Sequence, residues 1–144
     1  MGLDDVEIYL DLEEFFHIPF EPGKEYDGTV GFIIQYYQKR FHVEYFQKKK
    51  VAIDQFSFQD ENKITIGEYN TFAEYMGWPK AHWFRPGINP GSRTKIIQIF
   101  EKKLAEIDFT RNVSEEVKRI IKERLQYNGI ILESHNLYKD LGAG

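Results

Sequence analysis

The fold class depends on residues 29–58, which read TVGFIIQYYQKRFHVEYFQKKKVAIDQFSF. Much of this stretch consists of β-branched and aromatic side chains, which favour strands, and these fall into three runs: residues 30–37, 41–46 and 51–58. The polar connections 38–40 and 47–50 are short enough to be hairpin turns. The stretch therefore predicts a three-stranded antiparallel meander.

The flanking segments add less regular signals. Alternating apolar residues at 6–12 indicate a strand, although residues 12–18 are equally compatible with a short helix that stops before Pro19. We interpret this segment as a strand followed by a turn of helix. Residues 63–68 predict a fourth strand, and residues 130–132 can add a last one.

Three helices are expected in the second half of the chain. Thr71 and Glu74 have capping-box spacing, which predicts a helix of about two turns that ends at Gly77. Residues 93–107 and 112–129 then carry apolar residues at helical spacing, in the order Ile96, Ile97, Phe100, Leu104, Ile107 and Val117, Ile120, Ile121, Leu125. Together the elements predict an α+β fold, an antiparallel meander of four to five strands with two C-terminal amphipathic helices packed on one face.

Length and composition limit the classes of protein. A chain of 144 residues is the size of one domain, to which we assign residues 1–133, leaving 134–144 as a partly disordered tail. The absence of cysteine excludes disulfides and thiolate metal sites, and the scattered histidines form no metal motif, so no metal or cofactor is expected. The acidic start and the absence of a long apolar run indicate a cytoplasmic protein without a membrane segment.

One local segment, residues 78–95, has the chemistry of a binding site. It reads WPKAHWFRPGINPGSRTK and combines cations, stacking rings and a glycine turn that runs into a helix, whose N-terminal N–H groups favour an anion. The predicted ligand-binding residues are Trp78, Lys80, His82, Trp83, Arg85, Ser92, Arg93 and Lys95.

A structural interpretation of the same segment stays open. The tryptophans can belong to the core, Ser92 can be an N-cap, and the arginines can be solvated. Similarly, the basic groups at 39–40 and 48–50 can contact nucleic-acid phosphates or keep hairpin turns hydrated.

Three functional readings follow. The first is a non-enzymatic binding protein for a phosphate-bearing, ring-containing ligand, a nucleotide-like molecule or a nucleic-acid strand, held by residues 78–95. The second is a small acidic inhibitor or adaptor with a protein partner, for example a viral or mobile-element antagonist, and a homodimer is possible. The inhibitor or adaptor interpretation rests on the nine acidic residues within residues 3–27. An enzyme comes third, because no catalytic signature is present.

Overall fold

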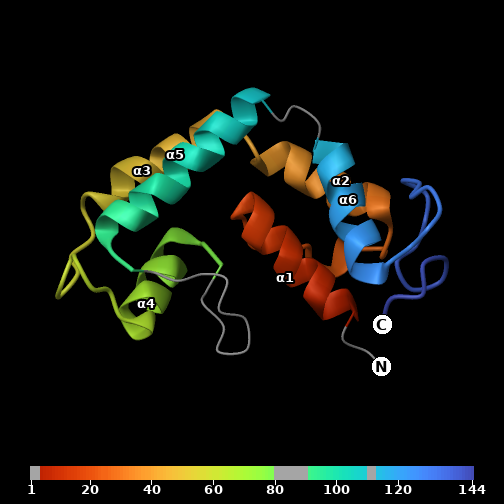
Figure 1. Cartoon of the computed structure of the whole chain (residues 1–144), viewed down its shortest axis with the longest axis horizontal. Coiled ribbons are helices and arrows are strands. Elements are labelled where there is room, and N and C mark those ends of the chain that lie inside the picture. The colour runs from red at the N-terminus through yellow and green to blue at the C-terminus, as the bar shows by residue number, and fades with distance from the viewer. Residues whose placement is uncertain (1–3, 80–90, 110–112) are drawn as a thin grey trace. The chain divides into compact units, whose positions relative to one another are not determined.

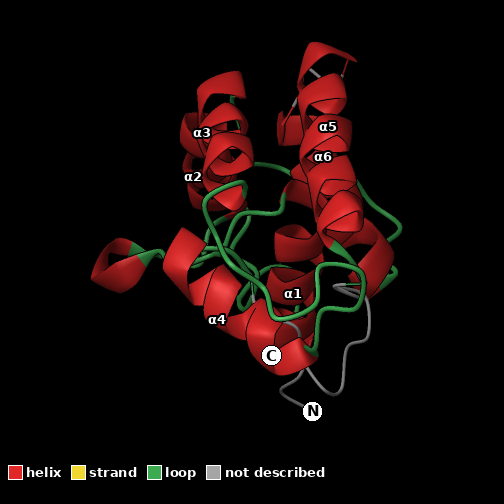
Figure 2. Cartoon of the chain, turned by 90° about the vertical axis from the view of Figure 1, so that its left-hand side faces the viewer, coloured by secondary structure: helices red, strands yellow, loops and turns green. Residues whose placement is uncertain are grey.

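Every regular element in the described part of the chain is helical. The computed structural model describes residues 4–79, 91–109 and 113–144. Its elements are α1 (Asp4–Phe16), a single 3-10 turn η1 (Gly23–Glu25), α2 (Val30–Arg40), α3 (Val43–Ile53), α4 (Ile66–Met76), α5 (Arg93–Phe109) and α6 (Val113–Leu125), and Figure 1 labels the α-helices. Figure 2 draws only helices and loops over these residues. The predicted α+β fold with its antiparallel meander is therefore wrong, and the described chain is all-helical.

The meander prediction failed because residues 29–58 also satisfy the helical period. Val30, Ile33, Ile34 and Tyr37 are all buried, and they share one face of α2 at spacings of three and four. Side-chain caps start both helices of the stretch. Thr29 Oγ1 accepts a hydrogen bond from the backbone N–H of Phe32 at 3.2 Å, and the side chain of His42 caps α3 in the same way. The basic groups predicted as hairpin turns instead belong to the C-terminal halves of α2 and α3.

The other corrections concern shorter elements. Residues 6–12, predicted as a strand, lie in α1, whose buried residues Ile8, Leu12 and Phe16 are spaced by four. The strand predicted at 63–68 is replaced by the start of α4, because Thr65 rather than Thr71 caps the helix, at 3.1 Å from the N–H of Glu68. Residues 130–132 form no strand. The two C-terminal helices are confirmed as α5 and α6 with nearly the predicted bounds.

The chain divides into two compact units, each described separately here. Unit 1 consists of Met1–Phe16, Phe20–Phe41 and Arg111–Gly144, and unit 2 of His17–Pro19 and His42–Thr110. The assignment of residues 1–133 to one domain stays a prediction. No helix in the described ranges is long and apolar enough to cross a membrane.

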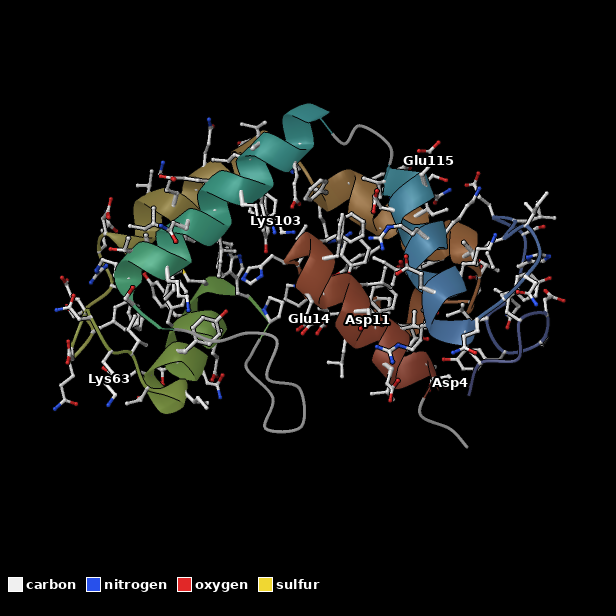
Figure 3. The ribbon with its side chains drawn as sticks, viewed as in Figure 1. Asp4, Asp11, Glu14, Lys63, Lys103 and Glu115 are labelled. Carbon is white, nitrogen blue, oxygen red and sulfur yellow. The ribbon has the colours of Figure 1, made fainter. Side chains whose placement is uncertain are left out.

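In unit 1, α6 packs against both α1 and α2. Its buried residues Val117, Ile120 and Ile121 supply the apolar face of this contact. Arg124 at the end of α6 reaches α1, where its Nε donates to Asp11 Oδ2 at 2.8 Å and its Nη1 to Glu7 Oε2 at 2.7 Å. Figure 3 labels Asp11 on α1. Part of the acidic N-terminal segment is thus paired within the fold.

The C-terminal segment completes the start of α2. The first N–H groups of a helix have no partner inside it, and here Val30 N donates to the His135 carbonyl at 2.9 Å and Gly31 N to the Glu133 carbonyl at 2.8 Å. A Cβ at position 31 would lie 3.1 Å from that Glu133 oxygen, so glycine permits the close approach. Leu137, fully buried, anchors the segment. Whether residues 134–144 partly fray in solution stays a prediction.

Unit 2 is built around the contact between α3 and α5, which lie side by side in Figure 1. Phe46 and Ile53 on α3 and Ile96 and Phe100 on α5 are fully buried. An aromatic cluster that includes Phe72 of α4 continues this core.

Candidate functional site

Residues 78–95, the predicted binding segment, are described only at their two ends. Lys80, His82, Trp83 and Arg85 lie outside the described residues, and their predicted role stays a prediction. Trp78, Ser92, Arg93 and Lys95 can be placed.

Trp78 is a core residue of unit 2. Its side chain is 3% exposed, and its ring lies 4.3 Å from the ring of Phe100 and 4.0 Å, edge to face, from that of His17. Its backbone N–H donates to the Ala73 carbonyl at 2.7 Å, just after α4. The ring of Trp78 is therefore covered on more than one side and offers little surface for stacking a ligand.

Arg93 is held by acceptors of its own unit. Nη1 donates to the carbonyl of Ile53, Nη2 to the carbonyl of Phe56 at 2.6 Å, and Nε to Glu61 Oε1 at 3.1 Å. The guanidinium carbon also lies 5.1 Å from the centre of the Phe58 ring. The Ile53 carbonyl at the end of α3 also accepts a hydrogen bond from Phe56 N at 3.2 Å, and Arg93 adds a charged donor to it. All three nitrogens of the guanidinium thus have acceptors within the fold.

Ser92 and Lys95 form the N-terminal cap of α5. Ser92 Oγ accepts a hydrogen bond from Lys95 N at 3.2 Å, and the Gly91 carbonyl accepts one from Ile64 N at 2.7 Å. The Lys95 side chain passes close to Gly91, where an added Cβ would lie 2.6 Å from Lys95 Cδ. The structure brings Ser92, Arg93 and Lys95 together at one helix start, but it directs Arg93 to the end of α3.

A second place with cations beside aromatic rings is a pocket in unit 1, which we call the α2 pocket. Its volume is about 140 Å³, and its walls come from η1 and α2: Pro22, Glu25, Phe32, Gln35, Tyr36, Lys39 and Arg40. The four other α2 residues lie three, four, seven and eight positions after Phe32, which places all five on one face of the helix. This face combines two cations, an amide and two rings.

Tyr36 organises the α2 pocket. Its side chain is 8% exposed, and its hydroxyl accepts a hydrogen bond from the backbone N–H of Glu21 at 3.0 Å, which holds the start of the turn against α2. The ring of Phe20 packs on the ring of Tyr36 at 4.9 Å. The segment that leads into η1 is therefore held against α2 by a hydrogen bond and by ring packing.

The guanidinium of Arg40 lies over the ring of Tyr36. Its guanidinium carbon is 3.7 Å from the centre of the Tyr36 ring, and Nη1 donates to the Tyr36 carbonyl at 3.0 Å. Among the described residues no acceptor is assigned to its Nε and Nη2, and neither Arg40 nor Lys39 forms an ion pair. Because the last carbonyls of a helix carry partial negative charge, the two cations also offset the dipole end of α2.

Sequence reasoning assigned residues 38–40 to a hairpin turn and so missed the α2 pocket. The signal was the spacing of Phe32, Gln35, Tyr36 and Lys39, which only becomes a surface once the segment is known to be helical.

Three tyrosines with raised pKa values, Tyr9, Tyr26 and Tyr138, form a structural hydrogen-bond network. Tyr9 OH lies 2.9 Å from Tyr26 OH and 2.6 Å from Tyr138 OH, and Tyr138 OH donates to Asp5 Oδ2 at 3.1 Å. Burial raises the pKa of Tyr26 to about 12 and raises the pKa of the other two tyrosines further. These hydroxyls stay protonated near neutral pH and tie the C-terminal segment to α1.

Potential metal ligands are not grouped in the part of the chain that is described, where no cluster of three or more histidine or carboxylate side chains is found. Comparison of the chain with family models, with curated proteins and with solved structures found no match.

Proposed function

We propose that the protein is a non-enzymatic binding protein whose ligand carries an oxyanion such as phosphate next to a flat ring, and that the α2 pocket holds it. The observation that carries this proposal is the meeting of Lys39 and Arg40, neither of them ion-paired within the described residues, with Phe32 and Tyr36 in one pocket. Hydrogen bonds from cations to phosphate or carboxylate are the strong ones, and the half-buried ring of Phe32 gives a stacking face.

The pocket is large enough to enclose the charged group of a ligand but not a whole drug-sized molecule. Sites that enclose a drug-sized molecule have volumes of roughly 300 to 1,000 Å³, whereas this pocket has about 140 Å³. The oxyanion would lie inside, near Arg40 and Lys39, and the ring would lie at the mouth. A nucleotide or the end of a nucleic-acid strand presents this chemistry. The absence of cysteine supports a cytoplasmic location.

Calorimetric titration with 4-ethylphenyl phosphate tests the proposal. We expect saturable binding, and we expect Lys39→Gln and Arg40→Gln each to weaken it about 10-fold or more, the size of a lost charge-assisted hydrogen bond. Lys122→Gln, an exposed charge change on α6, is the matched control and should bind like the wild type. Absence of binding at about 1 mM, a free energy of roughly −4 kcal/mol, or equal loss in all three variants contradicts the proposal. Titrations with adenosine monophosphate and a short oligonucleotide then distinguish the ligand's source.

The protein-partner reading is supported by a different surface, the outer face of α3. Val51 is 63% exposed, and it lines a shallow, mainly apolar hollow of about 320 Å³ together with Gln47, Lys48, Ala52 and Gln55. Exposed apolar surface of this kind favours association. If the partner is a second copy, sedimentation velocity of the wild type should show a dimer that Val51→Asp dissociates, and a monomer in both samples contradicts self-association.

A further inference from the structure

The α2 pocket carries charges of both signs. Lys39 and Arg40 contribute cations from α2, and Glu25 contributes a carboxylate from η1. Although they line a pocket of only about 140 Å³, none of the three is ion-paired with another described residue. Opposite charges are therefore held near each other without neutralising one another.

Three backbone hydrogen bonds fix the turn η1, which carries Glu25. Phe20 N donates to Glu13 Oε2 at 2.8 Å, and Glu21 N donates to Tyr36 OH at 3.0 Å, so the entry to the turn is fixed at two successive residues. The turn closes with a hydrogen bond from Tyr26 N to the Gly23 carbonyl at 3.5 Å. Glu25 thus comes from a braced turn, and α2 is the element opposite it.

A ligand whose only charged group is an oxyanion pairs with the two cations but leaves the Glu25 carboxylate without an opposite charge. The cations attract it, but the Glu25 carboxylate repels it, and like charges in one small site reduce affinity. Because Glu25 is exposed, its carboxylate can meet an ammonium group on the part of the ligand that extends past the ring, while the cations hold the oxyanion inside. We propose that the α2 pocket selects zwitterionic ligands, in which an ammonium group accompanies the ring-bound oxyanion. This inference rests on the proposed function and names the ligand class of the same site.

Two probes that differ only in the ammonium group test it. Tyramine phosphate and 4-ethylphenyl phosphate share the ring, the phosphate and the two-carbon chain. On the wild type we expect tyramine phosphate to bind more tightly by roughly 2- to 5-fold, the size of a partly exposed ion pair. In Glu25→Gln we expect opposite changes, a several-fold loss for tyramine phosphate and a gain for 4-ethylphenyl phosphate.

The matched control is Glu21→Gln. It removes the same charge four residues earlier, and the Glu21 side chain does not line the pocket, while its backbone N–H keeps the bond to Tyr36. Both probes should bind this variant as they bind the wild type. If both bind the wild type with equal affinity, or if Glu25→Gln changes both affinities in the same direction, the zwitterion inference is overturned and the binding function stands. If neither probe binds the wild type, the proposed function itself fails.

Discussion

Arg40 and Arg93 both place a guanidinium over an aromatic ring, yet their surroundings differ. In unit 2, Arg93 lies over Phe58, and each of its three guanidinium nitrogens donates to an acceptor of the fold. Two of these acceptors are backbone carbonyls. In unit 1, Arg40 over Tyr36 donates through Nη1 to one carbonyl and lines a pocket with Lys39. A cation beside a ring is a binding group only if its donors are not already satisfied by the fold. The difference between these two arginines locates the candidate site.

The largest effect is expected where the 78–95 segment enters the core of unit 2. Trp78→Ala should lower the free energy of unfolding by about 3 to 5 kcal/mol, because it leaves a large cavity beside Phe100 and His17. Denaturant unfolding measures this loss. A cost below about 1 kcal/mol would mean that Trp78 is not part of the core and would make it available to a ligand again.

Arg93→Ala should destabilise the protein by about 2 to 4 kcal/mol, because the carbonyls of Ile53 and Phe56 lose a charged donor. Arg93→Lys should not restore the loss, since an ammonium cannot reproduce the planar fork that reaches two carbonyls and Glu61. Denaturant melts of both variants are the measurement. If Arg93→Ala is as stable as the wild type, the hydrogen bonds of Arg93 do not stabilise the fold, and its contrast with Arg40 is contradicted.

His17 should make unit 2 sensitive to acid. Burial, together with the nearby Lys103 ammonium that is labelled in Figure 3, lowers the pKa of this imidazole to about 3. The folded pKa lies below the unfolded value near 6.5, so protonation favours the unfolded chain and stability falls as the pH falls below that value. The loss is on the order of 1 kcal/mol per pH unit between the unfolded and the folded pKa.

The comparison between the wild type and His17→Asn isolates this contribution. Asparagine tolerates the left-handed backbone of His17, whose φ is 56°. The stability difference between the two proteins should be constant above about pH 7 and should change in favour of the variant as the pH falls. Parallel pH profiles would show that His17 is not buried as a neutral side chain.

The smallest effect on stability is expected at the proposed site. Arg40→Ala should cost less than about 1 kcal/mol, because it loses one hydrogen bond and one ring contact at a half-buried position. Denaturant melts of Arg40→Ala beside Arg93→Ala make the contrast quantitative. If both variants lose the same free energy of unfolding, Arg40 stabilises the fold as Arg93 does, and the contrast between the two arginines is contradicted.

The helices that sequence reasoning predicted correctly are those with strongly polar outer faces. In α6 the buried residues Val117, Ile120 and Ile121 stand among charged residues, so only the helical period fits. In residues 29–58 the apolar runs are short and aromatic, and both periods fit them. The caps at Thr29 and His42 decide in favour of helices, and neither forms a capping box in the sequence.

The chemistry of the candidate site, cations beside rings, was predictable from composition, but its location was not. Arg93 is satisfied by the carbonyl of Ile53, which lies 40 residues earlier in the chain, and a sequence does not show such a contact. Arg40 and Tyr36, in contrast, are four residues apart. Their shared face could have been read from the sequence once residues 30–40 were recognised as a helix.

The most direct test is a two-dimensional ¹H–¹⁵N NMR titration of the wild-type protein with 4-ethylphenyl phosphate. If the α2 pocket is the site, the largest amide shifts should fall on residues 23–25 and 32–40, and the amides of Ser92, Arg93 and Lys95 should stay unchanged. Shifts concentrated at residues 91–95, or no shift up to about 10 mM, weaker than a binding free energy of roughly −3 kcal/mol, would contradict the assignment of the site to α2.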